Sequence, residues 1–301
     1  MTNYSAKIQE LKLKQSWSLP DKIEYSSELI RQWYEFYDGQ VYVSFSGGKD
    51  STVLLHLVRS IYPEVPAVFI DTGLEFPEIR DFVKTIDNVT WIKPKMSFKS
   101  IIEQYGYPVI SKETSRKIHQ ISTTNSDKLR QKRLYGDCNG NGKLAKKWQF
   151  LIDAPFKIHD YCCEVCKKRP SKLYEKQYNV KPMLGLMAQD SRLRTMAYCK
   201  YGCNAFVKTR PNSSPLYIWT IEDIWNYIKL YNIPFSNIYN LEYNHTGCMF
   251  CMFGICQDST PNRFQKMKET HPEIWNYCIH KLNLKQVLDF ISVPYECTFK
   301  T

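Results

Sequence analysis

The stretch "VYVSFSGGKDSTVLLHLV", residues 41–58, constrains the fold more than any other part of this chain. Its first five residues, Val41 to Phe45, are mostly β-branched or aromatic, which is typical of a buried strand. After the glycines, apolar side chains recur at helical spacing, at Val53, Leu54, Leu57 and Val58. The stretch therefore predicts a strand, a tight turn and a helix, in that order.

The turn has the composition of a phosphate-binding loop. Gly47 and Gly48 let the backbone approach a ligand without a Cβ in the way. The first N–H groups of the following helix would point at that ligand, and a helix N-terminus prefers an anion, most often phosphate. Lys49 adds a positive charge, and the hydroxyls of Ser46 and Ser51 add donors. The alternative is an ordinary glycine-rich turn capped by Ser or Asp.

Asp50 is the unusual member of this turn, because a carboxylate does not belong beside phosphates. It either caps the helix or holds Mg²⁺ or a water molecule near the phosphates. The turn is not a Walker A loop, which needs four residues between its first glycine and the Gly-Lys pair. It is also not the spaced-glycine fingerprint of dinucleotide-binding proteins.

The segment "SFSGGKDS", residues 44–51, resembles the pyrophosphate loop (PP-loop) of the adenine-nucleotide α-hydrolase superfamily. The resemblance implies that the chain either cleaves ATP between its α- and β-phosphates or binds an adenylyl-sulfate nucleotide. It also implies Lys49 and Asp50 as catalytic residues that act with Mg²⁺. The implied nucleotide contacts in this segment are Ser44, Ser46, Gly47, Gly48, Lys49, Asp50 and Ser51.

Strands and helices alternate on both sides of the loop. The predicted strands are residues 67–73, 89–94 and 181–188, and the predicted helices are 21–37, 77–86 and 97–106. This alternation predicts an α/β fold with a doubly wound parallel sheet, whose ligands bind at the carboxyl ends of the strands. We expect an N-terminal helical segment over 1–38, a nucleotide-binding α/β domain over 39–215 and a helical, cysteine-rich region over 216–301.

Two more polar turns follow predicted strands. "DTGLEFPE" begins with Asp71, which either caps a turn or lies beside the phosphate loop. This segment resembles the phosphoadenylyl-sulfate reductase branch of the superfamily, which implies nucleotide contacts at Asp71, Thr72 and Gly73. That branch also has Gly, Ser and Arg where this chain has "GLMAQDSRLR", residues 185–194. Arg192 is therefore a candidate bidentate donor to phosphate or sulfate, with an exposed loop as the alternative.

Six cysteines form two clusters that each contain a Cys-x-x-Cys pair. They are Cys162, Cys163 and Cys166 in "YCCEVCKKRP" and Cys248, Cys251 and Cys256 in "HTGCMFCMFGIC". Two such pairs, distant in sequence, can close a four-sulfur metal site. The spacing alone fits zinc as well as an iron–sulfur cluster.

A Cys-Cys pair before basic residues and a proline, with a later Gly-Cys-x-x-Cys, resembles the [4Fe–4S] pattern of bacterial adenylyl-sulfate reductases. It also resembles the pattern of related DNA phosphorothioation proteins. The resemblance implies Cys162, Cys163, Cys248 and Cys251 as ligands of a [4Fe–4S] cluster. Cys166 is an additional candidate, and so is Cys256.

The reductases that this chain resembles end in a mobile tail with Glu-Cys-Gly and a His, whose thiolate attacks the sulfur of the bound nucleotide. This chain ends in "VPYECTFKT", so Cys297 follows a Glu but the Gly and the His are missing. A nucleophilic thiolate needs a lowered pKa and access. Cys297 is a candidate nucleophile through the resemblance, and the reductase stays the second hypothesis.

Residues 112–150 interrupt the alternation and carry much of the charge. This segment holds ten Lys or Arg and three acidic residues, which is +7 of the net charge of +11. We interpret it as a partly helical insertion that binds a nucleic acid or a small anionic acceptor. The alternative is a solvated basic surface.

The composition also limits the compartment. The polar start "MTNYSAKIQELKLKQSW" is not a secretory signal, and no apolar run approaches the length of a membrane helix. These features predict a cytoplasmic protein with no membrane segment. Eleven cysteines in a reducing compartment favour metal or redox chemistry over a disulfide framework.

Together these features predict an ATP pyrophosphatase of the phosphoadenylyl-sulfate reductase family that adenylates a substrate for sulfur incorporation. An adenine nucleotide, Mg²⁺, a [4Fe–4S] cluster and a sulfur-donor protein are the expected cofactors and partners. One alternative is a reductase that releases sulfite from an adenylyl-sulfate nucleotide. The other is a non-catalytic regulator that binds nucleotide and DNA. Release of pyrophosphate from ATP separates the first hypothesis from both alternatives.

Overall fold

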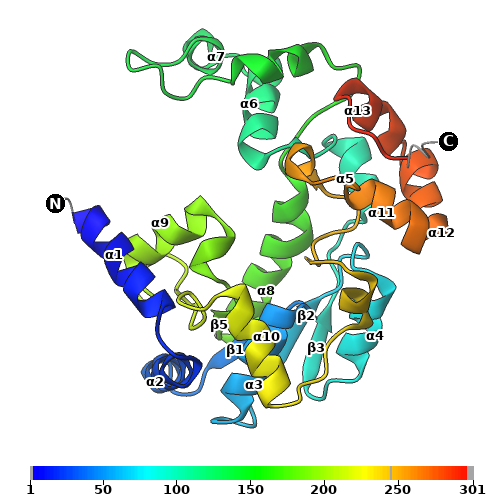
Figure 1. The fold of residues 1–301 in the computed structure, drawn as a ribbon. Helices are drawn as coiled ribbons and strands as arrows, with labels where there is room; N and C mark the ends of the chain where they lie inside the picture. The colour runs from blue at the N-terminus through cyan, green and yellow to red at the C-terminus, as the bar shows by residue number, and fades with distance from the viewer. Residues whose placement is uncertain (1–2, 245, 297–301) are drawn as a thin grey trace. The chain divides into compact units, whose positions relative to one another are not determined.

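The computed structural model describes residues 3–244 and 246–296, which fold into two compact units (Figure 1). Unit 1 contains the chain up to Asp71 together with Phe76–Lys93 and Pro170–Thr246. Unit 2 contains Thr72–Glu75, Pro94–Arg169 and the chain from Gly247 onward. Each unit is therefore assembled from segments that are far apart in sequence.

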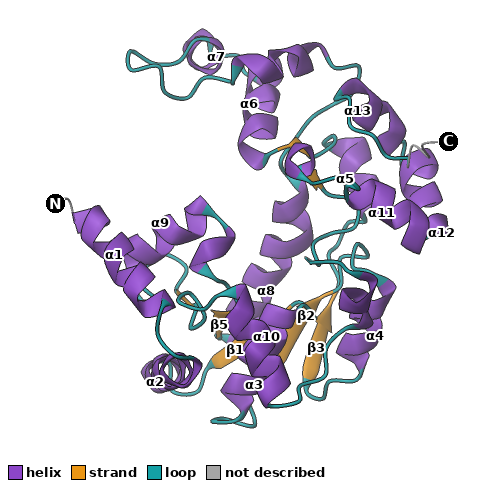
Figure 2. Ribbon diagram, viewed as in Figure 1, coloured by secondary structure: helices purple, strands orange, loops and turns teal. Residues whose placement is uncertain are grey.

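Unit 1 is built on a six-stranded sheet with the strand order β3-β2-β1-β5-β7-β6 (Figure 2). The strands are β1 (Val41–Phe45), β2 (Ala67–Ile70), β3 (Val89–Ile92), β5 (Lys181–Leu184), β6 (Asn204–Ala205) and β7 (Asn212–Ser213). All neighbouring strands pair in parallel except β6, which is antiparallel to β7. The predicted α/β class with a mostly parallel sheet is confirmed.

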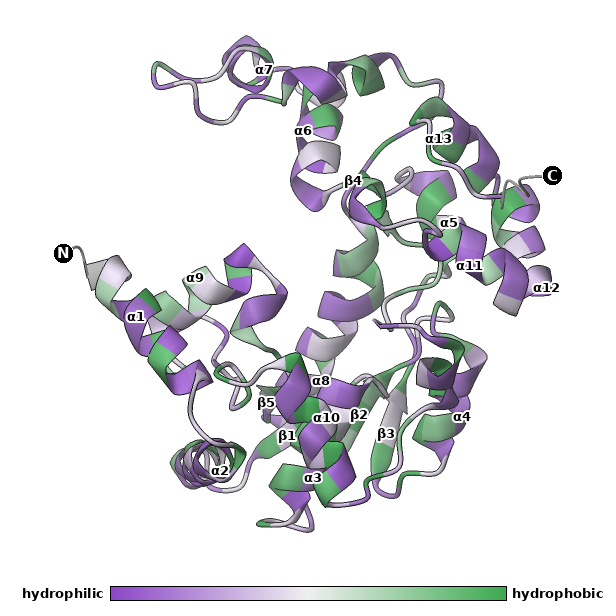
Figure 3. Ribbon diagram, in the orientation of Figure 1, coloured by the Kyte–Doolittle hydropathy of each residue, from purple (hydrophilic) through white to green (hydrophobic). Residues whose placement is uncertain are grey.

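Helices cover both faces of this sheet. Those of unit 1 are α1 (Asn3–Gln15), α2 (Leu19–Phe36), α3 (Lys49–Arg59), α4 (Pro77–Lys84), α8 (Arg169–Tyr178), α9 (Arg192–Tyr201) and α10 (Ile221–Leu230). The hydroxyl of Tyr42 in β1 donates to Glu175 of α8 at 2.8 Å, and the ring of Phe45 lies 6.4 Å from that of Phe82 in α4. Because residues three apart in a strand point to opposite faces, α8 and α4 lie on different sides of β1. Burial on both faces explains why the central parallel strands are apolar apart from Ser44 in β1, and β1 and β2 are mostly green in Figure 3.

The three strands predicted after the phosphate loop are all shorter in the structure than in the sequence analysis, and β3 ends at Ile92, where 89–94 was expected. β2 ends at Ile70, where 67–73 was expected, and β5 ends at Leu184, where 181–188 was expected. Gly73 adopts φ +74°, a conformation that a strand cannot contain. The polar residues after each strand therefore belong to loops at the carboxyl edge of the sheet.

Unit 2 is mainly helical and contains a short parallel pair of strands, β4 (Val109–Ile110) and β8 (Met252–Phe253). Its α-helices are α5 (Phe98–Gln104), α6 (Lys112–Thr123), α7 (Asp127–Leu134), α11 (Arg263–Thr270), α12 (Pro272–Asn276) and α13 (Leu284–Phe290). Shorter turns complete it: η1 (Lys146–Asp153) and η5 (Ile255–Gln257) are 3-10 turns, and η2 (Glu164–Lys168) and η6 (Tyr277–Lys281) are π-helical. The pairing of β4 with β8 joins chain segments that lie more than a hundred residues apart in sequence.

Among the described helices, none combines the length and the hydropathy needed to cross a bilayer.

A buried ion pair joins α2 to α10 in unit 1. The Lys22 ammonium lies 2.6 Å from the Asp223 carboxylate, and both residues are buried. Lys22 also donates to the carbonyl of Gln15 at 2.7 Å, and Asp223 accepts the N–H of Thr220 at 2.7 Å in a capping box at the start of α10. The pair is therefore part of the network that positions α10 against the N-terminal helices.

We expect Lys22→Met to lower the free energy of unfolding by about 3–5 kcal/mol, because it leaves the Asp223 carboxylate buried without its cation. Urea unfolding followed by circular dichroism measures the change. The matched control is Lys84→Met, which removes an exposed pair with Asp81 at 2.7 Å and should cost less than about 1 kcal/mol. Equal effects of the two substitutions would contradict a structural role for the buried pair.

Candidate nucleotide and thiol site

The phosphate-loop residues adopt the predicted strand–turn–helix geometry, and both glycines are required by space. Gly47 has φ +71°, and a Cβ there would lie 2.8 Å from the side chains of Ile79 and Val83 in α4. A Cβ on Gly48 would lie 2.6 Å from the hydroxyl of Thr246. The loop backbone is thus packed too closely for any larger residue.

The serine hydroxyls of the loop bond to the loop itself. The hydroxyl of Ser51 donates to the Gly48 carbonyl at 2.9 Å, and the Ser46 N–H donates to Ser51 Oγ at 3.1 Å. The hydroxyls of Ser46 and Ser51 lie 3.0 Å apart. Ser44 lies inside β1, opposite Val68 and Leu184 in the neighbouring strands. In this structure the serines fix the shape of the loop, and their contact with a nucleotide stays a prediction.

Lys49 and Asp50 form an ion pair at the start of α3. Lys49 is buried, and its Nζ lies 3.0 Å from Asp50 Oδ1. Burial raises the pKa of the Asp50 carboxyl, and the charge of Lys49 opposes this shift. Gly48 occupies the N-cap position, so the expectation that Asp50 caps the helix is wrong. The Asp50 carboxylate lies inside the first turn and is free of a capping role.

Asp50 fits the other expectation, a Mg²⁺ ligand. Its Oδ1 is buried and receives no hydrogen bond in the described structure, although the Lys49 ammonium is near. Mg²⁺ in nucleotide sites is commonly held by one or two carboxylates together with phosphate oxygens. The donor chemistry at this position therefore suits Mg²⁺ bound jointly by the protein and a nucleotide.

The turn after β5 lies directly against this loop. A Cβ on Gly185 would lie 2.9 Å from the carbonyl oxygen of Asp50. The charges of Asp190 and Arg194 both act on the pKa of Asp50, the first raising it and the second lowering it. Arg194 is engaged by Asp190, whereas Arg192 is exposed at the first position of α9. Arg192 is thus the arginine of this turn that has no ion pair in the described structure.

The residues after β2 have local partners. Asp71 is buried and accepts from Arg80 at 3.0 Å. The hydroxyl of Thr72 donates to Glu75 at 2.8 Å, and the Thr72 N–H donates to the same carboxylate at 2.9 Å. These bonds give the turn a defined shape that also includes Gly73. The predicted nucleotide contacts at Asp71, Thr72 and Gly73 stay predictions.

Five of the six candidate cysteines form one electrostatic group in unit 2. Cys162 and Cys166 share a hydrogen bond, which raises the pKa of Cys162 in the same direction as burial and lowers the pKa of Cys166 against the effect of burial. Burial raises the pKa of Cys248 to about 11, with further contributions from Cys251 and Cys163. The two clusters, more than eighty residues apart in sequence, are therefore brought together by the fold.

The group also contains a cation and an anion. The negative charge of Cys248 raises the pKa of Lys167, with which it shares a hydrogen bond, and Glu75 contributes in the same direction. Among the described residues, no group of three or more Cys, His, Asp or Glu side chains has the geometry to hold a metal ion. The donor chemistry nevertheless fits a soft metal centre, because thiols from two Cys-containing segments interact electrostatically with one lysine, Lys167, that can balance thiolate charge. Cys162, Cys163, Cys248 and Cys251 are the residues that would hold a [4Fe–4S] cluster.

The two remaining cysteines stand apart from this group. The groups that act on the pKa of Cys256 are Lys147 and Asp258, with no cluster thiol among them, and Cys256 is exposed. The structure thus does not bring Cys256 to the other five. Cys297, the candidate nucleophile, lies outside the described residues.

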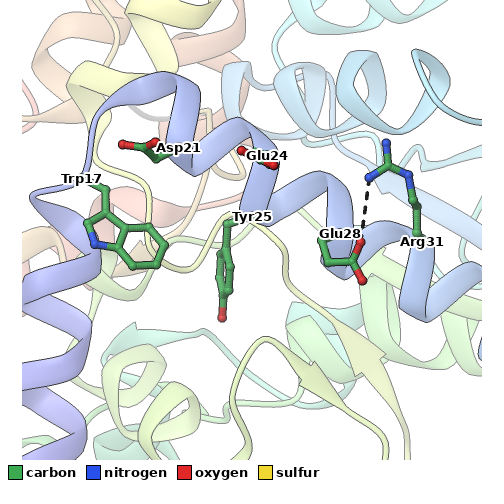
Figure 4. Close-up of a pocket in the computed structure, with 6 residues that line it drawn as sticks. All are labelled: Trp17, Asp21, Glu24, Tyr25, Glu28 and Arg31. Carbon is green, nitrogen blue, oxygen red and sulfur yellow. Dashed lines mark ion pairs between the residues drawn. The ribbon is translucent and has the colours of Figure 1, made fainter.

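A cavity of about 530 Å³ lies on α2, away from the phosphate loop in sequence and chemistry (Figure 4). It is lined by Trp17, Asp21, Glu24, Tyr25, Glu28 and Arg31. Three carboxylates would repel a polyphosphate, so the cavity does not suit the nucleotide. The chemistry of the loop, rather than the volume of this cavity, identifies the candidate nucleotide site.

Sequence comparison assigns the family. The family model described as the phosphoadenosine phosphosulfate reductase domain matches residues 40–131 and 108–253, more than half of the 301 residues. The chain belongs to this family, and the resemblance noted from its motifs is confirmed.

The chain is similar to curated proteins of two kinds. Two uncharacterized proteins of Methanocaldococcus jannaschii are each 26% identical to it, over 85% and 82% of this chain and 52% and 42% of their own lengths. The chain thus spans about half the length of these archaeal relatives. An adenosine 5'-phosphosulfate reductase of Halalkalibacterium halodurans is 26% identical over 75% of this chain and 80% of the relative. The family therefore includes enzymes.

Solved structures resemble the chain more distantly. A phosphoadenylyl-sulfate reductase from Candida auris aligns with a TM-score of 0.43 and 18% identity, over 74% of this chain and 87% of that one. A U34-tRNA thiolase from Methanococcus maripaludis, solved with its [4Fe–4S] cluster, aligns with a TM-score of 0.39 and 12% identity, over 94% and 84%. At these scores the resemblance does not extend to function.

Sequence reasoning missed Tyr239 as a residue of the site, and it did not predict the contacts of Glu75 and Gly185. The Tyr239 hydroxyl accepts the Lys49 N–H at 2.7 Å, so it occupies a donor at the helix N-terminus that a phosphate would use. The Glu75 carboxylate accepts hydrogen bonds from the N–H and the hydroxyl of Thr72, and its charge raises the pKa of Lys167. Gly185 allows the β5 turn to meet the loop. Gly185 had a signal, because a glycine directly after a strand marks close backbone approach, whereas Tyr239 had none.

We expect Lys49→Ala to weaken adenine-nucleotide binding by about tenfold to a hundredfold. The reason is the loss of a charge-assisted phosphate contact, which is typically worth about 1.5–3 kcal/mol. Isothermal titration calorimetry with ATP and adenylyl-sulfate measures the effect. Lys12→Ala, on exposed α1, is the matched control and should bind as the unmodified protein does. If Lys49→Ala binds ATP and adenylyl-sulfate with unchanged affinity, the loop is not the nucleotide-binding site.

We expect protein purified without oxygen to contain iron and acid-labile sulfide, and Cys248→Ser to lose both with the visible chromophore. Cys248 belongs to the thiol group, whereas Cys138 is exposed and belongs to another segment. Cys138→Ser should therefore keep the chromophore. Metal analysis that finds zinc in place of iron, without labile sulfide, would overturn the iron–sulfur assignment.

Proposed function

We propose that this protein is an ATP pyrophosphatase that adenylates an oxygen of its substrate and prepares that position for sulfur. The observation that carries the proposal is the ion pair of the buried Lys49 with Asp50 in a phosphate-type loop, combined with a thiol group elsewhere in the same chain. A loop of this kind suits triphosphate chemistry, and the thiols suit sulfur chemistry. The curated relatives named as adenosine 5'-phosphosulfate reductases agree with the coarser statement that the protein handles adenine nucleotides.

The first step follows from the charges of the loop. A substrate oxygen attacks the α-phosphorus of ATP, the bond to the bridging oxygen breaks, and pyrophosphate leaves with the electron pair. Lys49 and the N–H groups at the start of α3 would stabilise the charge on the leaving group. Asp50 would hold Mg²⁺ beside the same oxygens. The Tyr239 hydroxyl must then release the Lys49 N–H when a phosphate oxygen takes its place.

The second step replaces the adenylated oxygen by sulfur. A sulfide-level sulfur from the donor attacks the carbon that carries the activated oxygen, a carbon–sulfur bond forms, and AMP leaves with that oxygen. A [4Fe–4S] cluster held by Cys162, Cys163, Cys248 and Cys251 would supply sulfur coordination at this stage. Lys167 would hold positive charge beside the thiolates of the group. A partner protein is the expected source of the sulfur.

The reductase remains the second candidate function, favoured by the names of several curated relatives. It needs a nucleophilic thiolate at the tail, and the chain supplies Cys297 after Glu296 but not the glycine and histidine of the family pattern. A regulator without activity is the third candidate. It would bind nucleotide at the same loop without releasing pyrophosphate.

The test is a nucleotide panel with pyrophosphate and sulfite measured in parallel, using protein purified without oxygen. With ATP, Mg²⁺, sulfide as the sulfur donor and bulk tRNA as acceptor, we expect equal amounts of AMP and pyrophosphate and no sulfite from adenylyl-sulfate. Asp50→Asn should slow pyrophosphate release and raise the Mg²⁺ concentration needed, because one carboxylate ligand is lost. Lys12→Ala is the control. Sulfite release that depends on Cys297 would favour the reductase, and binding without either product would favour the regulator.

A further inference from the structure

The basic insert, residues 112–150, has a defined structure in unit 2. It contains α6, α7, the loop after α7 and the start of η1. Arg130 donates to the carbonyl of Thr124 at 2.7 Å, and Arg133 donates to Gln120 at 2.6 Å and to the carbonyl of Gly142 at 3.1 Å. These two arginines therefore join α6, α7 and the loop. Because their guanidinium groups form hydrogen bonds within the insert, these two arginines are not part of the proposed binding surface.

Each acidic residue of the insert forms an ion pair with a lysine or arginine of the insert. Glu113 pairs with Lys117, Asp127 with Arg130 and Asp137 with Lys132. Arg116 pairs with Asp160, which lies just beyond the insert. Every carboxylate of the insert is thus already taken by one of its own cations. Its remaining positive charge is not compensated locally.

That remaining charge lies on exposed lysines. They are Lys112, Lys128, Lys143, Lys146 and Lys147, and in the described structure none of them forms an ion pair with an acidic side chain. α7, which carries Lys128, has no buried residue and is mostly purple in Figure 3. Exposed cations without partners repel one another, so they destabilise the fold unless a polyanion binds.

Three of these lysines lie on a segment whose backbone is fixed by hydrogen bonds to α6 and α7. The Leu144 N–H donates to the carbonyl of Arg133, and the Leu144 side chain is buried. Lys117 of α6 donates to the carbonyl of Lys143 at 2.8 Å. Lys143, Lys146 and Lys147 on either side of Leu144 are exposed. The backbone is therefore fixed while the three ammonium groups extend into solvent.

Aromatic rings are interspersed with these lysines. Tyr135 is 71% exposed and Phe150 is 42% exposed. The Lys147 ammonium lies 5.0 Å from the centre of the Trp148 ring, and the Trp148 and Phe150 rings are 6.2 Å apart. Exposed rings next to lysines offer a stacking surface for bases beside contacts for phosphates.

We propose that the basic insert binds single-stranded or unpaired nucleic acid, with Lys143, Lys146 and Lys147 on the phosphates and Tyr135 on a base. A small anion would need convergent donors, whereas these lysines are spread along the segment. A duplex would use the lysines but not the rings, because its bases are already stacked. The binding itself does not depend on the proposed reaction. Only the further step, that the bound nucleic acid is the sulfur acceptor, rests on the proposed function.

The experiment is fluorescence anisotropy without ATP, using labelled single-stranded RNA, hairpin RNA with a loop, and duplex DNA over a range of salt. Lys143→Glu, Lys146→Glu and Lys147→Glu combined should weaken binding at least tenfold at low salt. The slope of log affinity against log salt should fall by about 2, since each single-strand phosphate contact contributes roughly 0.7. Tyr135→Ala should weaken single-stranded RNA about tenfold and leave duplex DNA unchanged, because only unpaired bases stack on the ring.

The matched control reverses three exposed lysines outside the insert, Lys12, Lys229 and Lys281, and keeps the same net charge as the test variant. It should bind RNA as the unmodified protein does. Equal losses in the two triple variants would overturn the proposal in favour of a general charge effect. Duplex DNA that binds as tightly as single-stranded RNA, or Tyr135→Ala without effect, would overturn the single-stranded preference. Pyrophosphate release measured on the same proteins separates a failure of this surface from a failure of the proposed reaction.

Discussion

The close packing of backbone around the start of α3 is the constraint on which the candidate nucleotide site depends. Three chain segments meet there without room for a side chain: Gly47 against α4, Gly48 against Thr246, and Gly185 against the backbone of Asp50. The parallel sheet makes this possible, because β1 and β5 are neighbours and their carboxyl ends lie at one edge. The loop is consequently held by sterics, with its serine hydroxyls bonded internally, and its polarity comes mostly from backbone N–H groups and Lys49.

The charges of Lys49 and Asp50 at this edge of the sheet would suit a ligand that carries both phosphate and a metal ion. Burial disfavours the charged form of Asp50, and the nearest compensation is the Lys49 ammonium. A triphosphate would attract Lys49, and Mg²⁺ would then replace it as the counter-ion of Asp50. In the described structure the ion pair gives both Lys49 and Asp50 an opposite charge, which avoids the cost of an uncompensated charge away from water.

The elements around the loop could be predicted because their signals are local. The run of β-branched and aromatic residues located β1, and the helical spacing of the apolar residues located α3. The ends of β2 and β5 were placed too late. β2 ends at Ile70, before the polar residues that lead into the turn at Gly73, and apolar residues continue after Gly185, where β5 has already ended. Tyr239 could not be predicted at all. Its hydroxyl reaches the Lys49 N–H across 190 residues of sequence, and nothing in the segment around it distinguishes it from a packing residue.

The cysteines also show that sequence spacing does not determine which side chains meet in the fold. Their spacing grouped six residues, and the structure groups five, because Cys256 follows the turn at Gly254 and lies beside Lys147 and Asp258. Spacing counts residues along the chain, whereas a thiol group is defined by which side chains the backbone turns toward one another. The basic insert shows the corresponding limit for charge. Its sum of +7 is correct, yet Arg130 and Arg133 donate to carbonyls inside the insert, whereas five lysines are exposed and form no ion pair in the described structure: Lys112, Lys128, Lys143, Lys146 and Lys147. This division follows from their chemistry, since a planar guanidinium can bridge several carbonyls whereas a strongly hydrated ammonium stays in water. A polyanion therefore meets the lysines first, and the arginines determine how rigidly those lysines are presented.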